Sequence, residues 1–479
     1  MIYDLCIIGA GYAGVNALHA AKDYLNFDSH VLMVDIRDGY AGQWRDQYAY
    51  VRLHQPYQHF TAGNFSWRIK KPRGYLANRD EVISHLNNIA VEAAKKVNVE
   101  NYFKYRYIKH TEDEDGVSVI LQSVDNNENE DPIEVRTKRL ILAQGFDIKI
   151  LKPLDWESTL INSMSVSDPA IVDINTNNLP PAIYIIGGGK TAMDCALHLI
   201  KKTGGNVQIN MFAGRGSFFG VRENWFPTNW RRWVYGSCSV FSDNILNFVL
   251  RYQGDNAAEV YQEFVRRNIL HGLVPKPENF SFGLVSKAEL TAIKFGLEKV
   301  YVGHVKSIHD VSGSPIALLE HKGKVTEHAL ETGAWVINAT SHIKEIGTIP
   351  IMSKGGKVCA PQNVLFFSGP SAFVITHLLF LGKLEECWKL LRYTSVEEEP
   401  KDRMGLNWTV FYLSNLMEMI FLLPIKVLLQ LSADYNRWFP WYRQIPAMIN
   451  LIWYRSKIRD IGDKILPARY TESDMYKQA

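Results

Sequence analysis

The chain has 479 residues, enough for two or three domains, and an ordinary globular composition of 47% hydrophobic and 22% charged residues. The formal net charge of +3 does not favour a nucleic-acid-binding surface. The five cysteines lack C-x-x-C or metal-ligand spacing, so the sequence predicts no disulfide framework, no metal site and no dithiol redox centre.

The chain begins with a predicted strand, a glycine turn and a helix. An unbroken apolar run over residues 5–8 leads into a G-x-G-x-x-G motif made of Gly9, Gly11 and Gly14. Such glycines allow the tight turn, the approach of a pyrophosphate and close helix packing, while the helix N-terminus attracts the anion. A second strand ends in Asp35, placed to accept a hydrogen bond from a ribose 2′-OH. The alternative is a glycine-rich turn that has only a structural role and binds no ligand.

The early position of this strand leaves no room for a secretory signal. Together with the cysteine pattern, this predicts a reduced, cytoplasmic protein.

A second strand–turn–helix unit follows near residue 183. Its G-x-G-x-x-A motif contains Gly187, Gly189, Lys190, Thr191 and Ala192. The next strand, over residues 207–212, leads to Arg215 and has no acid at its tip. A guanidinium there suits a 2′-phosphate, which favours NADPH over NADH. Lys190 either contacts phosphate as well or is a solvated surface lysine.

Two such units predict an α/β protein with two Rossmann-like domains. The first unit is expected over residues 1–170 and 335–400, and the second over 175–334 with a helical insertion at about 225–297. Arginines and aromatics interleave between residues 222 and 233, either lining a substrate cleft or anchoring a helix surface.

An α-helical, apolar extension is predicted over residues 401–479. Its longest uncharged run, residues 404–417, is shorter than a spanning helix needs. Tryptophan, tyrosine and arginine then mix over residues 438–455, as in interfacial elements. Two interpretations stay open: peripheral membrane contact, or a cap that packs on the first domain or on a second subunit of a homodimer.

Several further motifs make the chain resemble the class B flavin-dependent monooxygenases, which include flavin-containing monooxygenases and YUCCA enzymes. Residues 42–44 are similar to the end of the family's G-G-x-W motif, with Ala41 at its first glycine. Residues 50–56 are similar to the L-x-L-H-x-P stretch, and residues 75–82 to the Y-L-x-x-x-x-E-V helix start. Residues 143–145 and 339–341 stand where the family has A-T-G, so the resemblance covers some four-fifths of the chain.

The resemblance implies that the first unit binds FAD and the second binds NADPH. Residues of the FAD site would be Gly9, Gly11, Gly14, Asp35, Gln43, Trp44, Gly145 and Gly369. Residues of the NADPH site would be Gly187, Gly189, Thr191, Ala192, Arg215 and Thr340. By this resemblance His54 would fall near the flavin ring, and it is the first candidate for a catalytic polar group. The alternative is a histidine that only packs in the core and bonds to the backbone. Arg52 is the second candidate, because its positive charge could balance the negative charge of a reduced flavin. The alternative is that Arg52 forms an ordinary ion pair.

One signature of the oxygenating members is missing. Their F-x-G-x-x-x-H-x-x-x-F/Y motif should fall between residues 151 and 169, where Asn162-Ser163 occupies the place of the histidine and serine.

Three functions stay open, and the resemblance implies the first of them. The first is a monooxygenase in which NADPH reduces FAD and O2 adds at flavin C4a as a hydroperoxide, to oxygenate a small or lipophilic substrate. The second is an NAD(P)H-dependent reductase that passes electrons to a quinone or another acceptor. The third is a flavin-binding sensor or scaffold.

Overall fold

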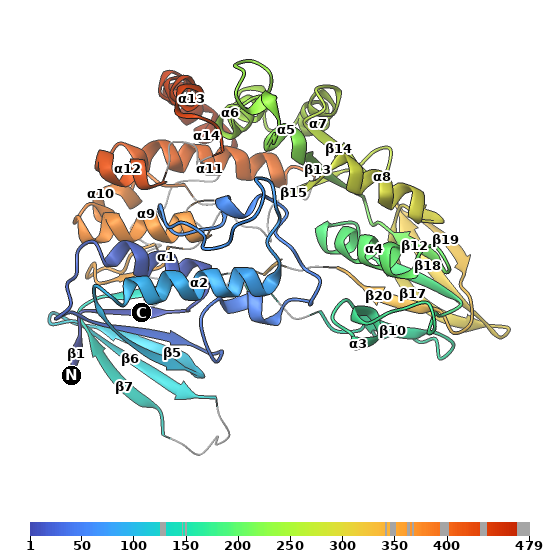
Figure 1. Cartoon of the computed structure of the whole chain (residues 1–479), viewed down its shortest axis with the longest axis horizontal. Helices are drawn as coiled ribbons and strands as arrows, with labels where there is room; N and C mark the ends of the chain where they lie inside the picture. The colour runs from blue at the N-terminus through green and yellow to red at the C-terminus, as the bar shows by residue number, and fades with distance from the viewer. Residues whose placement is uncertain are drawn as a thin grey trace.

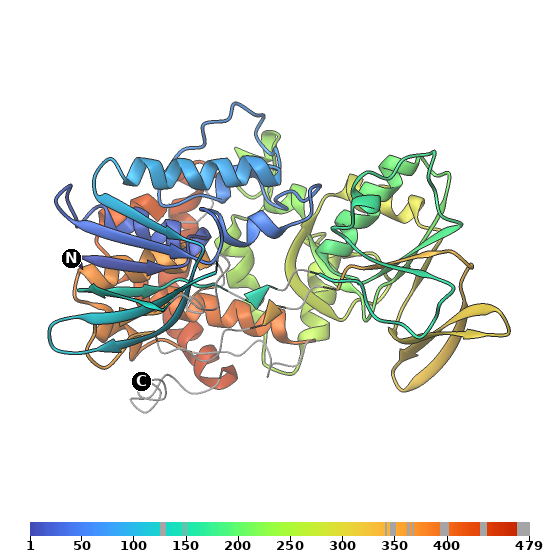
Figure 2. The ribbon, with the colours of Figure 1, turned by 90° about the horizontal axis from the view of Figure 1, so that it is seen from below.

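The computed structural model describes residues 1–124, 131–145, 147–148, 151–340, 343–344, 351–361, 365, 368–392, 402–431 and 438–466. Two α/β units lie side by side, and a layer of helices lies along one side of the molecule (Figures 1 and 2). This arrangement confirms the predicted fold class of two Rossmann-like units with C-terminal helices.

The first unit is built on a parallel sheet with the order β22-β8-β2-β3-β4. These strands are, in the same order, Val358–Cys359, Leu140–Leu142, Leu5–Ile8, His30–Asp35 and Asn98–Phe103. Every residue of the central strand β2 is buried, which is why an unbroken apolar run encodes it. Helix α1 (Tyr12–Ala21) follows β2, and α9 (Ser368–Phe380) packs beside it (Figure 1). The chain therefore returns to the first unit with β22 and α9.

A mainly antiparallel sheet extends the first unit, in the order β1-β7-β6-β5. Its strands are Ile2–Tyr3, Ile133–Thr137, Val117–Ser123 and Tyr105–Glu112. The Y-L-x-x-x-x-E-V stretch does begin a helix, α2 (Arg79–Ala93). Asn78 caps it, because its side chain accepts from the Glu81 N–H at 2.9 Å while the Glu81 carboxylate accepts from the Asn78 N–H at 2.9 Å.

The second unit is built on another parallel sheet, in the order β10-β20-β11-β12-β16. Its strands are Asn162–Ser165, Trp335–Asn338, Ala182–Ile186, Gln208–Phe212 and Lys299–Tyr301. The boundaries expected from the sequence, at residues 170 and 335, assign β10 and β20 to the first unit. They instead pair with each other and β20 pairs with β11. A short apolar run alone does not reveal which of two parallel sheets it joins.

Helices α4 (Lys190–Thr203) and α8 (Lys287–Gly296) belong to the second unit. So do strands β17 (His304–Val311), β18 (Ser314–His321) and β19 (Lys324–Ala329), which form an antiparallel sheet.

The insertion of the second unit is not purely helical. It holds α5 (Arg222–Trp225), α6 (Phe241–Arg251) and α7 (Ala257–Arg266). It also holds β14 (Leu270–Gly272) and β15 (Asn279–Val285), which pair on either side of β13 (Ser217–Val221). The expectation of a helical stretch to residue 297 is therefore wrong between 270 and 285.

The C-terminal helices pack on both units rather than standing apart. They are α11 (Met404–Ile420), α12 (Ile425–Leu431), α13 (Trp441–Trp453) and α14 (Arg455–Ile465). One hydrophobic cluster joins Leu413 of α11 to Phe248 of α6 and to Phe373 of α9. Among the described residues, no helix is both long and apolar enough to cross a membrane.

The remaining short elements are connectors. They are α3 (Pro169–Val172), α10 (Leu384–Trp388), β9 (Asp147–Ile148), β21 (Ile343–Lys344) and the 3-10 turns η1 (Gly42–Asp46), η2 (Tyr57–His59) and η3 (Trp230–Arg232).

Candidate functional site: two dinucleotide turns and their junction

The first glycine turn is shaped by contacts that only glycine allows. Gly9 has φ +102°, and a Cβ on it would lie 2.4 Å from the carbonyl oxygen of Ala143. A Cβ on Gly14 would lie 1.7 Å from the Gly9 oxygen. Helix α1 starts after Gly11 without a side-chain cap and without an acid in its first turn. Its first N–H groups are therefore left for an anion.

Asp35 lies beside this turn at the end of β3. Its carboxylate accepts from the Ala10 N–H at 2.7 Å and from the Arg37 N–H at 2.8 Å. Only 6% of the residue is exposed, and this burial raises the pKa of the carboxyl group. The structure thus places Asp35 at the glycine turn, and its contact with a ribose stays a prediction.

The loop over residues 41–44 lies against the same turn. The Ala41 N–H donates to the Ala10 carbonyl at 2.9 Å, and a Cβ on Gly42 would come within 2.8 Å of the Gly11 Cα. Ala41 has φ +93°, a conformation that favours the glycine of the family motif. Trp44 is partly buried against Phe60, with ring centroids 5.4 Å apart, whereas Gln43 is exposed.

Two later glycines border the first turn differently. Gly145 follows β8 with φ +72°, and a Cβ on it would meet nothing within 4 Å. Gly369 lies in the first turn of α9, where a Cβ would come within 2.4 Å of the Tyr12 ring. Gly145 therefore leaves open space, while Gly369 allows α9 to approach α1.

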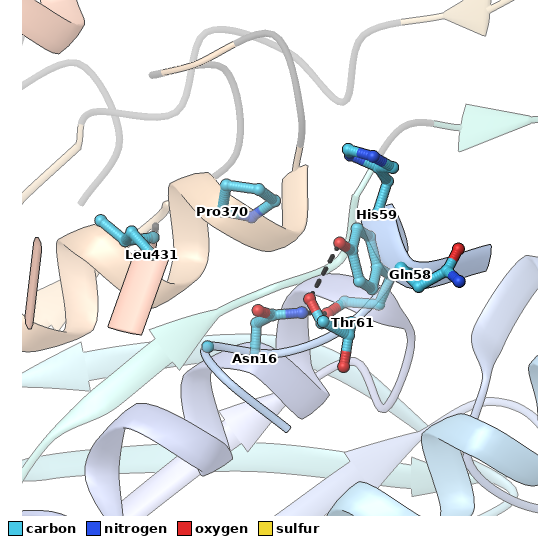
Figure 3. A pocket seen from close by; sticks show the side chains of 8 residues that line it. Asn16, Gln58, His59, Thr61, Pro370 and Leu431 are labelled. Carbon is cyan, nitrogen blue, oxygen red and sulfur yellow. Dashed lines mark hydrogen bonds between the residues drawn. The ribbon is translucent and has the colours of Figure 1, made fainter. Parts of the chain in front are cut away.

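A small pocket lies where α1 and α9 begin. It is lined by Tyr12, Asn16, Gln58, His59, Thr61, Gly63, Pro370 and Leu431 (Figure 3). The Tyr12 hydroxyl donates to the Thr61 carbonyl at 3.1 Å, and Tyr12 stacks on Phe60 with centroids 3.9 Å apart. The amide oxygen of Gln58 is buried and has no hydrogen-bond partner among the described residues. No sequence motif singled this pocket out.

The second glycine turn is more open than the first. A Cβ on Gly187, where φ is +140°, would lie 2.5 Å from the Ala339 oxygen. A Cβ on Gly189 would meet nothing within 4 Å. Helix α4 begins at Lys190 without a side-chain cap, followed by partly buried Thr191 and buried Ala192. The turn therefore leaves both space and N–H donors for a pyrophosphate.

Arg215 and Thr340 lie at the two sides of this turn. Arg215 is exposed after β12 and makes no hydrogen bond or ion pair with another described residue. The Thr340 hydroxyl donates to the Asn338 side-chain oxygen at 2.7 Å, one residue beyond Ala339 at the Gly187 contact. An unpaired guanidinium is well suited to a phosphate.

His54 lies at the junction of the two units. Its Nδ1 accepts from the Leu284 N–H at 3.2 Å, and its carbonyl accepts from Arg222 Nε at 2.8 Å. Burial lowers the pKa of His54 to about 3, and the positive charges of Lys190 and Arg222 lower it further. A neutral ring whose Nδ1 accepts must carry its proton on Nε2, so Nε2 is a donor at the junction.

Arg52 is not brought to either glycine turn. It is exposed, and its guanidinium donates to the Leu76 carbonyl at 3.0 Å and lies 5.8 Å from the centre of the Tyr75 ring. Among the described residues, Arg52 therefore contacts only the first unit, whereas His54, two residues later, contacts the second.

Sequence reasoning missed a second set of junction residues. The Tyr48 hydroxyl donates to the Asp194 carboxylate at 3.0 Å, and Lys190 forms an ion pair with the same carboxylate. Tyr50 stacks on His198 with ring centroids 4.0 Å apart. The spacing of Lys190 and Asp194, four residues apart on a helix, is the one sequence signal that could have indicated part of this set.

Asn162, at the position of the missing signature histidine, has a structural role. It begins β10, where its side chain donates to the Gly333 carbonyl at 3.2 Å. The Ser163 hydroxyl donates to the Leu154 carbonyl at 2.5 Å. These contacts join the two ends of the second unit.

The residues present fit two dinucleotides. Each glycine turn precedes an uncapped helix, Asp35 stands at the first turn and unpaired Arg215 stands at the second.

Comparisons with known proteins agree with this geometry. Residues 3–213 match the family model described as pyridine nucleotide-disulphide oxidoreductase. No curated protein sequence matches the chain.

The solved structures found by comparison share little sequence with this chain. Bacillithiol disulfide reductase from Bacillus cereus is 11% identical over 81% of this chain and 100% of its own, with a TM-score of 0.43. Ornithine hydroxylase from Pseudomonas aeruginosa is 11% identical over 80% of this chain and 99% of its own, with a TM-score of 0.46. Cyclohexanone monooxygenase is 12% identical over 80% of this chain and 88% of its own, with a TM-score of 0.49.

Proposed function

We propose that the chain, whose residues 3–213 match the model of the pyridine nucleotide-disulphide oxidoreductase family, is an NADPH-using flavin monooxygenase. The match supports an FAD- and NAD(P)-dependent oxidoreductase. When both are bound, a nicotinamide cofactor supplies a hydride and a flavin accepts it. The proposed substrate is a small or lipophilic organic molecule that is oxygenated with O2.

The observation that carries the proposal is His54, a residue of the first unit that is held by the insertion of the second unit. Leu284 and Arg222 hold it by hydrogen bonds, and burial, helped by the positive charge of Lys190, lowers its pKa. A neutral donor on Nε2 can orient a polar group without adding charge to the junction. The chain's own task is thus to bind, to orient and to exclude water rather than to form a covalent bond.

The cysteines support oxygenation over dithiol chemistry. Cys6, Cys195, Cys359 and Cys387 are buried, Cys238 is partly buried, and all five are free. Burial raises the pKa of the Cys195 and Cys359 thiols to about 12. Such thiols do not serve as a redox-active pair, so a thiol relay to a disulfide substrate is disfavoured.

A second candidate is a reductase that passes electrons to a quinone or another acceptor. Asn162 favours it, since the histidine of the oxygenating members is absent and the amide serves the fold instead. The third candidate, a sensor or scaffold, is disfavoured by the open space at Gly189, which a protein that had lost its cofactor would have no reason to keep.

Rapid mixing distinguishes the three functions. The purified flavoprotein is reduced with NADPH, mixed with O2 and followed by absorbance. A monooxygenase gives a long-lived species whose spectrum matches neither oxidised nor reduced flavin. Direct reoxidation without that species would favour the reductase, and a flavin that NADPH does not reduce would leave the sensor.

The preference for NADPH is tested at Arg215. We expect Arg215→Ala to weaken NADPH binding by about tenfold or more relative to NADH, because a charge-assisted contact with the 2′-phosphate is lost. Arg266→Ala, at an equally exposed arginine on α7, is the matched control. Equal loss of both cofactors' affinity in Arg215→Ala would contradict the assignment.

A further inference from the structure

Helix α13 buries its charge and exposes its apolar side chains. Trp441 is 72% exposed, Ile449 is 58% exposed and Trp453 is 80% exposed, and Ile445 and Ile452 are exposed on the same face. Arg443, the one charged residue of α13, is buried. A surface helix of a globular protein normally has the opposite arrangement, with its apolar stripe facing the core.

Arg443 explains how this orientation is held. Its guanidinium donates to the carbonyl oxygens of Arg231 at 2.7 Å and of Arg232 at 2.8 Å, and also to that of Cys238. The Tyr442 hydroxyl donates to the Trp233 carbonyl at 2.7 Å. The first turn of α13 is therefore fixed to residues 230–238 of the insertion.

The fixed segment exposes large apolar side chains of its own. Trp230 is 64% exposed, and Trp233, Val234 and Tyr235 are also exposed. We call the exposed apolar side chains of residues 230–235 and of α13 the apolar face. Figure 1 shows α13 at the outer edge of the helical layer, on the side away from the sheet of the first unit. Exposed apolar patches of this kind mark interaction sites.

The segments that form this face carry an excess of positive charge. Residues 226–240 and 438–459 contain no aspartate or glutamate, and their charged residues are Arg231, Arg232, Arg443, Arg455, Lys457 and Arg459. Arg232 and Arg443 are buried, Glu418 of α11 pairs with Arg455 at 3.3 Å and with Arg459 at 2.8 Å, and Asp460 follows directly. From outside these segments, Asp243 of α6 accepts from Asn450 at 3.3 Å and is partly buried. An apolar face flanked by basic residues complements an anionic lipid surface.

We propose that the apolar face docks the protein on the surface of a bilayer that contains anionic lipids. Helix α13 has 13 residues and is about 20 Å long, less than the roughly 30 Å of hydrocarbon in a bilayer. It therefore lies in the interface, where tryptophan and tyrosine are favoured, and does not cross it. The proposal does not depend on which reaction the nucleotide units perform.

A second copy of the chain fits the face less well. Two identical faces in contact would bring the basic flanks of both copies together, and like charges across an interface are unfavourable. Lipid headgroups would instead neutralise them.

The test uses the full-length protein and two kinds of vesicle. Phosphatidylcholine vesicles are compared with vesicles of equal parts phosphatidylcholine and phosphatidylglycerol, by co-sedimentation and by quenching of tryptophan fluorescence with brominated acyl chains. We expect binding to the anionic vesicles, tryptophan quenching, and release by high salt. Wild-type protein that remains in the supernatant without quenching would overturn the proposal, independently of any variant.

Variants locate the binding surface. Ile449→Ser and Trp453→Ser are each expected to weaken partition roughly tenfold to hundredfold, because each removes one large apolar side chain from the lipid. Phe295→Ser is the control, since Phe295 is 87% exposed on α8, far from the face in sequence. Equal partition of the variants and wild type would overturn the proposal, as would concentration-dependent dimers that Trp453→Ser dissociates without any vesicle binding.

Discussion

At the scale of single residues, two glycines of the second turn differ in how much room they leave for a methyl group. Gly187 and Gly189 belong to the same motif, yet a Cβ would meet backbone within 2.5 Å at Gly187 and nothing within 4 Å at Gly189. The first glycine therefore serves the fold, and the second leaves space that the folded chain alone does not use.

Alanine substitutions separate these two roles. We expect Gly187→Ala to destabilise the protein by about 2–4 kcal/mol, because it adds a backbone clash to a positive φ. Gly189→Ala should leave stability unchanged or slightly higher but weaken NADPH binding by about tenfold or more. Urea denaturation and cofactor titration measure the two effects. Unchanged NADPH affinity in Gly189→Ala would contradict the assigned pyrophosphate position.

Buried neutral histidines make the stability depend on pH. His85 stacks on Trp67 with centroids 3.7 Å apart, its Nε2 lies 2.9 Å from the Thr61 hydroxyl, and burial lowers its pKa to about 3. The pKa of His54 is lowered to about 3 as well. Between pH 6.5 and 3 the unfolded chain therefore binds more protons than the folded one, so these groups stabilise fully above about pH 6.5 and progressively less below it.

We expect the free energy of unfolding to fall between about pH 7 and about pH 5. The contribution of His85 is about 2 kcal/mol at most, and His85→Gln should remove that part of the slope. Urea denaturation at both pH values is the measurement. A slope that is the same in wild type and His85→Gln would show that His85 is accessible to protons in the folded state.

At the scale of elements, buried polar side chains join the C-terminal helices to the rest. The fully buried Asn415 of α11 accepts from the Arg392 N–H at 2.8 Å and donates to the Arg392 carbonyl at 3.0 Å. The Tyr252 hydroxyl, after α6, donates to the Asn407 side chain at 2.8 Å. Helix α11 of the extension is therefore part of the core.

Asn415→Ala should cost about 2–3 kcal/mol, because it leaves two buried backbone groups of Arg392 without their partner. Asn450→Ala, at an exposed asparagine on α13, should change stability by less than about 0.5 kcal/mol. Denaturant unfolding compares the two variants, and similar costs would mean that α11 is not part of the cooperative core.

The sequence predicts local features of these elements better than their partners. The glycines, Asp35 and the cap at Asn78 follow from short-range patterns, because a turn or a helix start is decided by neighbouring residues. The hydrogen bond between His54 and Leu284 spans 230 positions, and the bond between Arg443 and Cys238 spans 205. No local pattern encodes such pairs, which is why the sequence did not reveal that His54 contacts the second unit, whereas the contacts of Arg52 lie in the first.

At the scale of the whole molecule, the junction couples the two units. Tyr48 of the first unit holds Asp194 of the second, and Asp194 pairs with Lys190 at the open N-terminus of α4. A change at Tyr48 therefore affects both the angle between the units and the charge next to the second turn.

Tyr48→Phe is expected to slow reduction of the flavin by NADPH by about tenfold, the equivalent of one hydrogen bond to a charged group, with FAD affinity unchanged. Stopped-flow absorbance measures the reduction, and a flavin titration measures the affinity. An unchanged reduction rate would mean that the junction does not position the hydride donor.

The chain also enters and leaves the second unit at neighbouring positions. The Asn338 side chain, at the end of β20, donates to the Lys152 carbonyl at 2.7 Å, and β9 pairs with β21, so the two connections to the first unit lie side by side. A segment with adjacent ends can be exchanged as a block without reshaping its host. Evolution or protein engineering could therefore replace the second unit, which is proposed to bind the nicotinamide cofactor, and leave the first unit unchanged.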